Sequence, residues 1–163
     1  MDKRTSDIPS FDKPPGAIAI DLDGTLLDSS TRLSERSHRA LKNCIRQGIP
    51  VIIATSRPIR IFNRIFPQDL RERCSFIVMN GAVAKGNPPL SGHYKETFPL
   101  ETARSIVEFA SNFNPDIRVT LELDGYEFGT NYPQADAATL WQRNSATPDM
   151  VFFCWRSATT ASM

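Results

Sequence analysis

The chain has 163 residues, of which 40% are hydrophobic and 23% are charged, and its formal net charge is +1. This size allows one domain, or one domain with part of a second, and the composition is typical of a globular protein. The balanced charge argues against a nucleic-acid partner, and no apolar run approaches the ~20 residues of a membrane span. The first residues lack the apolar segment of a secretory signal. We therefore predict a cytoplasmic protein whose three cysteines, Cys44, Cys74 and Cys154, are reduced.

Short apolar runs alternate with amphipathic segments over residues 16–80, after a polar stretch at 1–15 that predicts a mobile tail. The apolar runs predict strands buried on both faces, at residues 17–20, 49–55 and 76–80. The amphipathic segments predict helices at residues 33–48 and 58–66. Ser34 is a suitable N-cap for the first helix, and Gly48 is suitably placed to end it. Strands separated by helices predict an α/β fold with a Rossmann-like parallel sheet.

The pattern changes after Gly81, where hairpin signals replace the alternation of strand and helix. One hairpin is predicted around a Gly-Asn-Pro-Pro turn, and another around Asp124-Gly125. In chain order, the predicted elements are a hairpin at 82–98, a helix at 100–113, a hairpin at 117–131, a helix at 134–144 and a strand at 150–155. This half of the chain is therefore predicted to form a separate α+β unit.

A polar residue stands at the carboxyl end of each predicted core strand: Asp21, Thr55 and Asn80. The carboxyl ends of parallel strands share one edge of the sheet, and ligands bind at that edge in open α/β folds. Asp23 lies two residues after Asp21, so both carboxylates can face the same side of an extended chain. Close carboxylates repel each other unless a cation lies beside them, and Mg²⁺ prefers such oxygen ligands.

The residues after the acid pair suit an anion. Gly24 allows a sharp turn that leaves backbone N–H groups available, and Thr25 adds a hydroxyl. One carboxylate could attack phosphorus while the other protonates the leaving oxygen. Asp-x-Asp-Gly-Thr is also a common strand end and turn, so the pattern alone is weak evidence. A calcium-binding EF-hand is excluded, because Leu26 and Arg32 occupy the positions where that loop needs glycine and glutamate.

Three motifs in the expected order resemble those of the haloacid dehalogenase superfamily of phosphohydrolases, and most closely its Cof-type (IIB) branch. "DLDGTLLDS" resembles the nucleophile motif, "IPVIIATSRP" the second motif, and "IVMNGAVA" the strand before the cap; the resemblance covers about residues 15–131. It implies a Mg²⁺-dependent phosphatase of small phosphorylated metabolites that acts through an aspartyl-phosphate. Asp21 resembles the nucleophile and a metal ligand. Asp23 resembles the general acid/base, with its backbone carbonyl as the second metal contact.

The resemblance also implies further site residues and a domain division. Phosphate binding is expected at Gly24, Thr25, Thr55 and Ser56, and the substrate rim at Arg57, Asn80 and Gly81. Ser56 stands where the family usually has glycine. Residues 16–97 correspond to the N-terminal part of the core, and residues 98–163 to part of a C2-type cap, which closes over the site and selects the substrate.

Two parts of the family's site have no counterpart in the sequence. These are a lysine after the cap, which Lys85 and Lys95 precede, and an acidic Gly-Asp-x-x-Asn-Asp motif on a later core strand. We therefore expect a chain truncated within the cap, whose incomplete sheet leaves an edge open to self-association. Two alternatives to an active phosphatase follow: a catalytically inactive fragment, or an interaction module that retains the core motifs.

Five arginines lie in the segment at residues 57–73. They are predicted to form a solvated, charged surface rather than a site that attracts phosphate. Arg57 is the exception, because it adjoins the second motif at the rim of the site.

Overall fold

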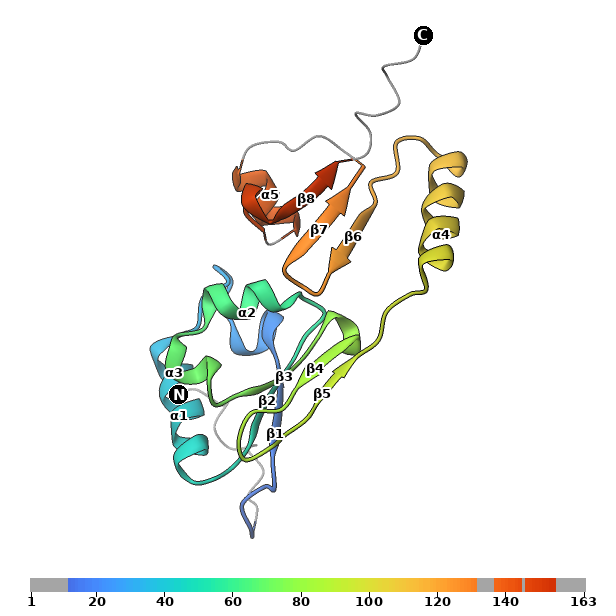
Figure 1. The fold of residues 1–163 in the computed structure, drawn as a ribbon. Helices are drawn as coiled ribbons and strands as arrows, with labels where there is room; N and C mark the ends of the chain where they lie inside the picture. The colour runs from blue at the N-terminus through green and yellow to red at the C-terminus, as the bar shows by residue number, and fades with distance from the viewer. Residues whose placement is uncertain (1–11, 132–136, 145, 155–163) are drawn as a thin grey trace.

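The computed structural model describes residues 12–131, 137–144 and 146–154, so most of the tail predicted at 1–15 lies outside the described residues. Two separate sheets are formed (Figure 1). The first has the order β1 (Ile18–Asp21), β2 (Val51–Ala54), β3 (Ser75–Val78), β4 (Val83–Lys85), β5 (His93–Lys95). Strands β1, β2 and β3 pair in parallel, whereas β4 and β5 continue the sheet as an antiparallel hairpin. The predicted α/β class with a Rossmann-like parallel sheet is confirmed.

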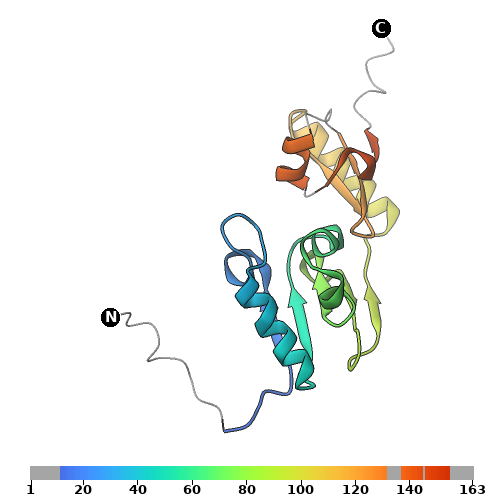
Figure 2. The ribbon, with the colours of Figure 1, turned by 90° about the vertical axis from the view of Figure 1, so that its left-hand side faces the viewer.

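Three helices cover one face of the five-stranded sheet: α1 (Glu35–Arg46), α2 (Ile59–Ile65) and α3 (Gln68–Arg71) (Figures 1 and 2). The Ser34 hydroxyl accepts a hydrogen bond from the Ser37 backbone N–H at 3.0 Å, which confirms the predicted N-cap of α1. At the other end, Gly48 has a φ of +74°, and the N–H of Ile49 donates to the carbonyl of Cys44 at 3.0 Å. This left-handed C-terminal motif ends the helix where the glycine predicted.

Two details of the first half were not predicted. Helix α3 is a single turn of four residues, too short to give a periodic pattern. Strand β3 ends at Val78, two residues before the predicted end, because Met79 and Asn80 both adopt positive φ angles and leave the extended conformation.

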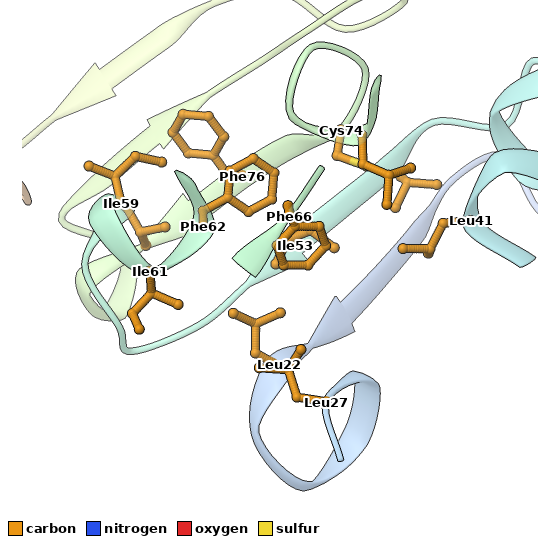
Figure 3. Packing of buried hydrophobic residues seen from close by; sticks show 13 residues of the cluster. Leu22, Leu27, Leu41, Ile53, Ile59, Ile61, Phe62, Phe66, Cys74 and Phe76 are labelled. Carbon is orange, nitrogen blue, oxygen red and sulfur yellow. The ribbon is translucent and has the colours of Figure 1, made fainter. Parts of the chain in front are cut away.

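The hydrophobic core lies between the sheet and these helices. Figure 3 shows side chains from the strands and from α1 and α2 meeting on this side of the sheet. The Phe62 ring packs against Phe66 and Phe76, with ring centroids 4.5 Å and 5.5 Å apart. Ile53, in the central parallel strand, is fully buried. Burial of these apolar side chains supplies the main stabilisation of this part of the chain.

The predicted burial of the core strands on both faces is wrong. In β1, Ile18 and Ile20 are half-buried while Ala19 is exposed, and in β3 Ile77 is 38% exposed. Among the described residues no helix lies on the face opposite α1, α2 and α3. Unbroken β-branched runs are typical of strands covered on both sides, but here every second side chain points away from the helices.

The second unit, defined as residues 100–154, begins with α4 (Leu100–Phe113). Its sheet has the order β6 (Thr120–Leu123), β7 (Glu127–Thr130), β8 (Val151–Cys154). The predicted turn between β6 and β7 is present, with φ of +55° at Asp124 and +75° at Gly125, as a type I′ hairpin turn requires. Helix α5 (Ala137–Asn144) lies within the predicted helix at 134–144, of which 134–136 lie outside the described residues. Residue 155 of the predicted last strand also lies outside them.

No helix in the described part of the chain is long and apolar enough to cross a membrane.

Burial protects one of the two cysteines whose side chains are described. Desolvation, reinforced by the nearby Asp69 carboxylate, raises the pKa of the buried Cys74 thiol from 9.0 to about 11, whereas Cys44 is only half-buried. We expect iodoacetamide at pH 8 to modify Cys44 well before Cys74 in the native chain, and both equally in denaturant. Because the pKa of the Cys74 thiol is higher in the folded than in the unfolded chain, the free energy of unfolding should fall as the pH rises from 9 to about 11. This fall should be larger in the wild type than in Cys74→Ala, which lacks the thiol. Peptide mass spectrometry and denaturation at each pH test this, and equal native labelling of the two thiols would contradict it.

Candidate active site

Parallel pairing brings the three predicted strand-end residues to one edge of the sheet. Asp21 ends β1, Thr55 directly follows β2, and Asn80 follows β3 by two residues. In the register of the sheet, Asp21 pairs with Ala54, and Ala54 pairs with Ile77, so the ends of the strands are level. This edge is formed by the carboxyl ends of the parallel strands, where the sequence predicted these three residues. We call the segments 21–25, 55–57 and 79–81 the rim.

The acid pair lies on the open side of the first rim segment. Leu22 is fully buried, whereas Asp21 and Asp23 on either side of it are exposed, so the alternation of an extended chain continues past the strand. Gly24 then has a φ of +72°, which a residue with a side chain rarely adopts. The turn closes when the N–H of Leu27 donates to the carbonyl of Leu22 at 3.0 Å. Thr25 lies exposed in this turn, as expected for a hydroxyl offered to a ligand.

Arg57 forms an ion pair with the second of the two acids. Its Nε donates to Asp23 Oδ2 at 2.7 Å, and the side chains are 27% and 43% exposed, respectively. The sequence placed Arg57 only at the rim, and nothing in the local pattern showed that it contacts Asp23. The contact fixes the orientation of the Asp23 carboxylate, because a guanidinium offers its donors in a rigid plane.

The second rim segment is held by backbone hydrogen bonds. Thr55 is buried, and its N–H donates to the carbonyl of Ile77 at 2.9 Å. Its hydroxyl oxygen accepts from the backbone N–H of Arg57 at 3.1 Å, which leaves the hydroxyl hydrogen free to be donated to a bound oxyanion. Ser56 is exposed beside it. A threonine here thus shapes the loop and also presents a donor.

The third rim segment has an unusual backbone. Met79, Asn80 and Gly81 all have positive φ angles, of +54°, +56° and +95°. Asparagine and glycine tolerate this region, but methionine does not, and such a residue costs on the order of 1–2 kcal/mol. The N–H of Met79 donates to the carbonyl of Arg57 at 3.1 Å, which ties this segment to the second one.

The oxygen atoms of Asp21 and Asp23 suit a hard cation as ligands, but they are few. In residues 12–131, 137–144 and 146–154, no three histidine, cysteine or acidic side chains gather closely enough to hold a metal. The Asp21 carboxylate and the Asp23 backbone carbonyl are oxygen donors of the kind that Mg²⁺ prefers. The Asp23 carboxylate itself is engaged by Arg57. The residues present would therefore offer Mg²⁺ oxygen ligands on one side only.

The prediction of a solvated arginine surface at 57–73 is wrong for Arg60. This residue is only 2% exposed, and its guanidinium donates to both carboxylate oxygens of Glu122, at 2.5 Å and 2.8 Å. Glu122 lies in β6 of the second unit, 62 residues further along the chain. Arg60 lies between Ile59 and Ile61 in the sequence, and these apolar neighbours are the one local sign of its burial.

Comparison with known proteins places the chain in a family. A family model described as haloacid dehalogenase-like hydrolase matches residues 18–153. Phosphatase YwpJ of Bacillus subtilis (strain 168) is 30% identical over 139 residues, which is 77% of this chain and 48% of the relative. The 5-amino-6-(5-phospho-D-ribitylamino)uracil phosphatase YitU of the same organism is 30% identical over 101 residues, covering 61% of this chain and 37% of that protein. The chain thus spans about half or less of the length of these curated relatives.

A solved structure has a similar fold. SMU.1108c from Streptococcus mutans UA159 matches with a TM-score of 0.69 at 24% identity, over 85% of this chain and 50% of that chain. The resemblance found in the three motifs is confirmed, since the family match extends from β1 to β8. The chain therefore belongs to the haloacid dehalogenase-like hydrolases, and is by family an enzyme.

Proposed function

We propose that this chain carries the nucleophile half of a Mg²⁺-dependent phosphatase of small phosphorylated metabolites. The observation that carries the proposal is the exposed acid pair on a shared rim, with Asp23 oriented by Arg57 Nε at 2.7 Å. Two relatives named phosphatases support the reaction type. We place the phosphatase in the cytoplasm, with residues 16–97 as core and 98–163 as part of the cap, a division that the two separate sheets support.

In the first step, an Asp21 carboxylate oxygen attacks phosphorus and forms an aspartyl-phosphate, while the bond from phosphorus to the leaving oxygen breaks. Asp23 donates its proton to that oxygen. Water then attacks the phosphorus of the intermediate, the bond from phosphorus to the Asp21 oxygen breaks, and Asp23 takes a proton from the attacking water. Inorganic phosphate leaves, and the Asp21 carboxylate is regenerated. Arg57 orients the Asp23 side chain in both steps, whether its carboxyl group carries a proton or not.

Other rim residues bind the phosphoryl group. The Thr55 hydroxyl, the exposed Ser56 and Thr25 side chains, and the backbone of Gly24 provide donors for its oxygens. Asn80 and Gly81 form the part of the rim that faces the rest of the substrate. Bound Mg²⁺, held by the Asp21 carboxylate and the Asp23 carbonyl, would supply positive charge beside the phosphoryl oxygens.

Asp21→Asn tests the proposal directly. We expect the purified chain to hydrolyse para-nitrophenyl phosphate with Mg²⁺, and the variant to lose turnover by about 10³-fold or more, because an amide is no nucleophile. EDTA should have the same effect. Asp28→Asn is the matched control, since Asp28 lies outside the rim and its side-chain contacts in the described part of the chain stay within its own loop. It accepts from the backbone N–H groups of Ser30 and Arg32, and its Oδ2 lies 4.0 Å from Arg32 Nε.

Equal rates for wild type and Asp21→Asn would instead support the inactive fragment. The interaction module remains the other alternative, and β1 or β5 is the strand through which it would self-associate, because these two are the edges of the five-stranded sheet. Light scattering of the purified chain distinguishes this alternative, since it requires a mass above that of the 18.2 kDa monomer.

A further inference from the structure

Helix α2 of the core contacts the second unit through the buried side chain of Arg60. The guanidinium holds Glu122 with both of its terminal nitrogens, and its Cζ lies 5.2 Å from the centroid of the fully buried Phe128 ring. A bidentate ion pair combined with stacking on an aromatic ring restricts the guanidinium to one orientation. The Arg60 side chain is 1% exposed and that of Glu122 is 27% exposed, so most of the pair is removed from water.

The same arginine also holds the turn between β6 and β7. Its backbone N–H donates to the carbonyl of Gly125 at 3.2 Å, and its Nη1 approaches the same oxygen at 3.4 Å. Arg60 is the second residue of α2, so this N–H has no acceptor within its own helix. The carbonyl of the second unit therefore caps an N–H group that the helix leaves unsatisfied.

The turn fits closely against two segments of the rim. A Cβ placed on Gly125 would lie 3.0 Å from Ile59 Cγ2 and 3.2 Å from Met79 Sδ. Ile59 begins α2 and is separated from the second rim segment by Pro58 alone, and Met79 begins the third segment. Figures 1 and 2 both show the β6–β7 turn pointing at this end of the core. Two more contacts flank the turn: an ion pair between Lys95 and Asp124, and a hydrogen bond between Asn63 and Tyr126.

We propose that Arg60 is a docking residue that holds the β6–β7 turn on the start of α2 and thereby positions two segments of the rim. Glu122, Gly125 and Phe128 form its receptor on the second unit. Arg60 is a positioning residue, because it reaches the acid pair only through the backbone of α2 and of the Arg57 loop. The docking itself goes beyond the proposed function and requires no turnover; only its consequence for the rim rests on that function.

The backbone amide of Arg60 gives a readout specific to docking. Because this amide donates to the Gly125 carbonyl of the second unit, its hydrogen exchange reports whether the β6–β7 turn is in contact with α2. We expect this amide to be protected at least 10-fold in the wild type, as measured by NMR exchange on the full chain. Glu122→Gln removes the charge that binds the Arg60 guanidinium, so the protection of the Arg60 amide should fall by about 10-fold in this variant. Glu127→Gln removes the same charge from an exposed position of the same hairpin and should leave the protection unchanged.

Gly125→Ala provides a second, independent variant. Its matched control is Gly48→Ala, because Gly48 has a φ of +74° against +75° for Gly125 but nothing within 4 Å of an added Cβ. Both variants strain the backbone, so both lose stability, but only Gly125→Ala should deprotect the Arg60 amide. The resonance of Arg57 Nε–H should shift in Gly125→Ala and Glu122→Gln, and stay in place in both controls.

The proposal is overturned by three results. These are an unprotected Arg60 amide in the wild type, equal effects of a variant and its matched control, or a loss of protection that is as large at the β6 and β7 amides as at Arg60. The last result would show that the variants unfold the hairpin instead of undocking it. Inactivity of the wild-type chain would leave the docking intact and count against the proposed function alone.

Discussion

Replacing Arg57 by alanine is expected to lower kcat/KM for para-nitrophenyl phosphate about 10- to 100-fold, with most of the loss in kcat. Arg57 Nε donates to the carboxylate of Asp23, the proposed general acid/base, at 2.7 Å, and removal of a residue that orients a catalytic group typically has an effect of this size. Because both side chains are partly exposed, the ion pair contributes little to stability, and the free energy of unfolding should change by less than about 1 kcal/mol.

Two further variants separate orientation from charge. Arg57→Lys keeps the positive charge but not the planar donor, so it should recover only part of the activity. Arg64→Ala removes an exposed arginine of α2, the helix that follows the Arg57 loop, and should leave kcat/KM unchanged. If Arg57→Ala raised KM alone, Arg57 would be a substrate contact at the rim and not a residue that positions Asp23.

Truncating Phe62 to alanine is expected to cost about 3–5 kcal/mol of unfolding free energy. The Phe62 side chain is 2% exposed and lies in contact with the rings of Phe66 and Phe76, so its loss leaves a cavity between α2 and the sheet. Urea denaturation followed by circular dichroism measures the change, and the midpoint should fall without a large change in slope.

Phe109→Ala is the matched control for this truncation. Phe109 is 73% exposed on α4, although its ring lies 6.3 Å from that of Phe113, so we expect a change within about 0.5 kcal/mol. Similar losses for the two variants would mean that the Phe109 ring is covered in solution and that the core on the helix side of the sheet is not the main source of stability.

Local patterns were sufficient for most of the elements, although not for helix α3 or the end of β3, and for the order of the rim. The Ser34 cap and the Gly48 end of α1, and the Asp124-Gly125 turn, each depend on residues within one turn of chain, and each is found where it was predicted. The same holds for the rim, because the strand–helix–strand order alone places Asp21, Thr55 and Asn80 at one edge of a parallel sheet.

What the sequence by itself determined is therefore the family, the α/β class and the residues that reach the rim, all of which follow from short-range periodicity and contiguous motifs. The tertiary structure alone decided three other features: which face of the sheet is covered, that Arg57 pairs with Asp23, and that Arg60 is buried against Glu122. The pairs join residues 34 and 62 positions apart. A charged side chain carries no local mark of such a distant partner, and in the absence of one arginine is almost always solvated.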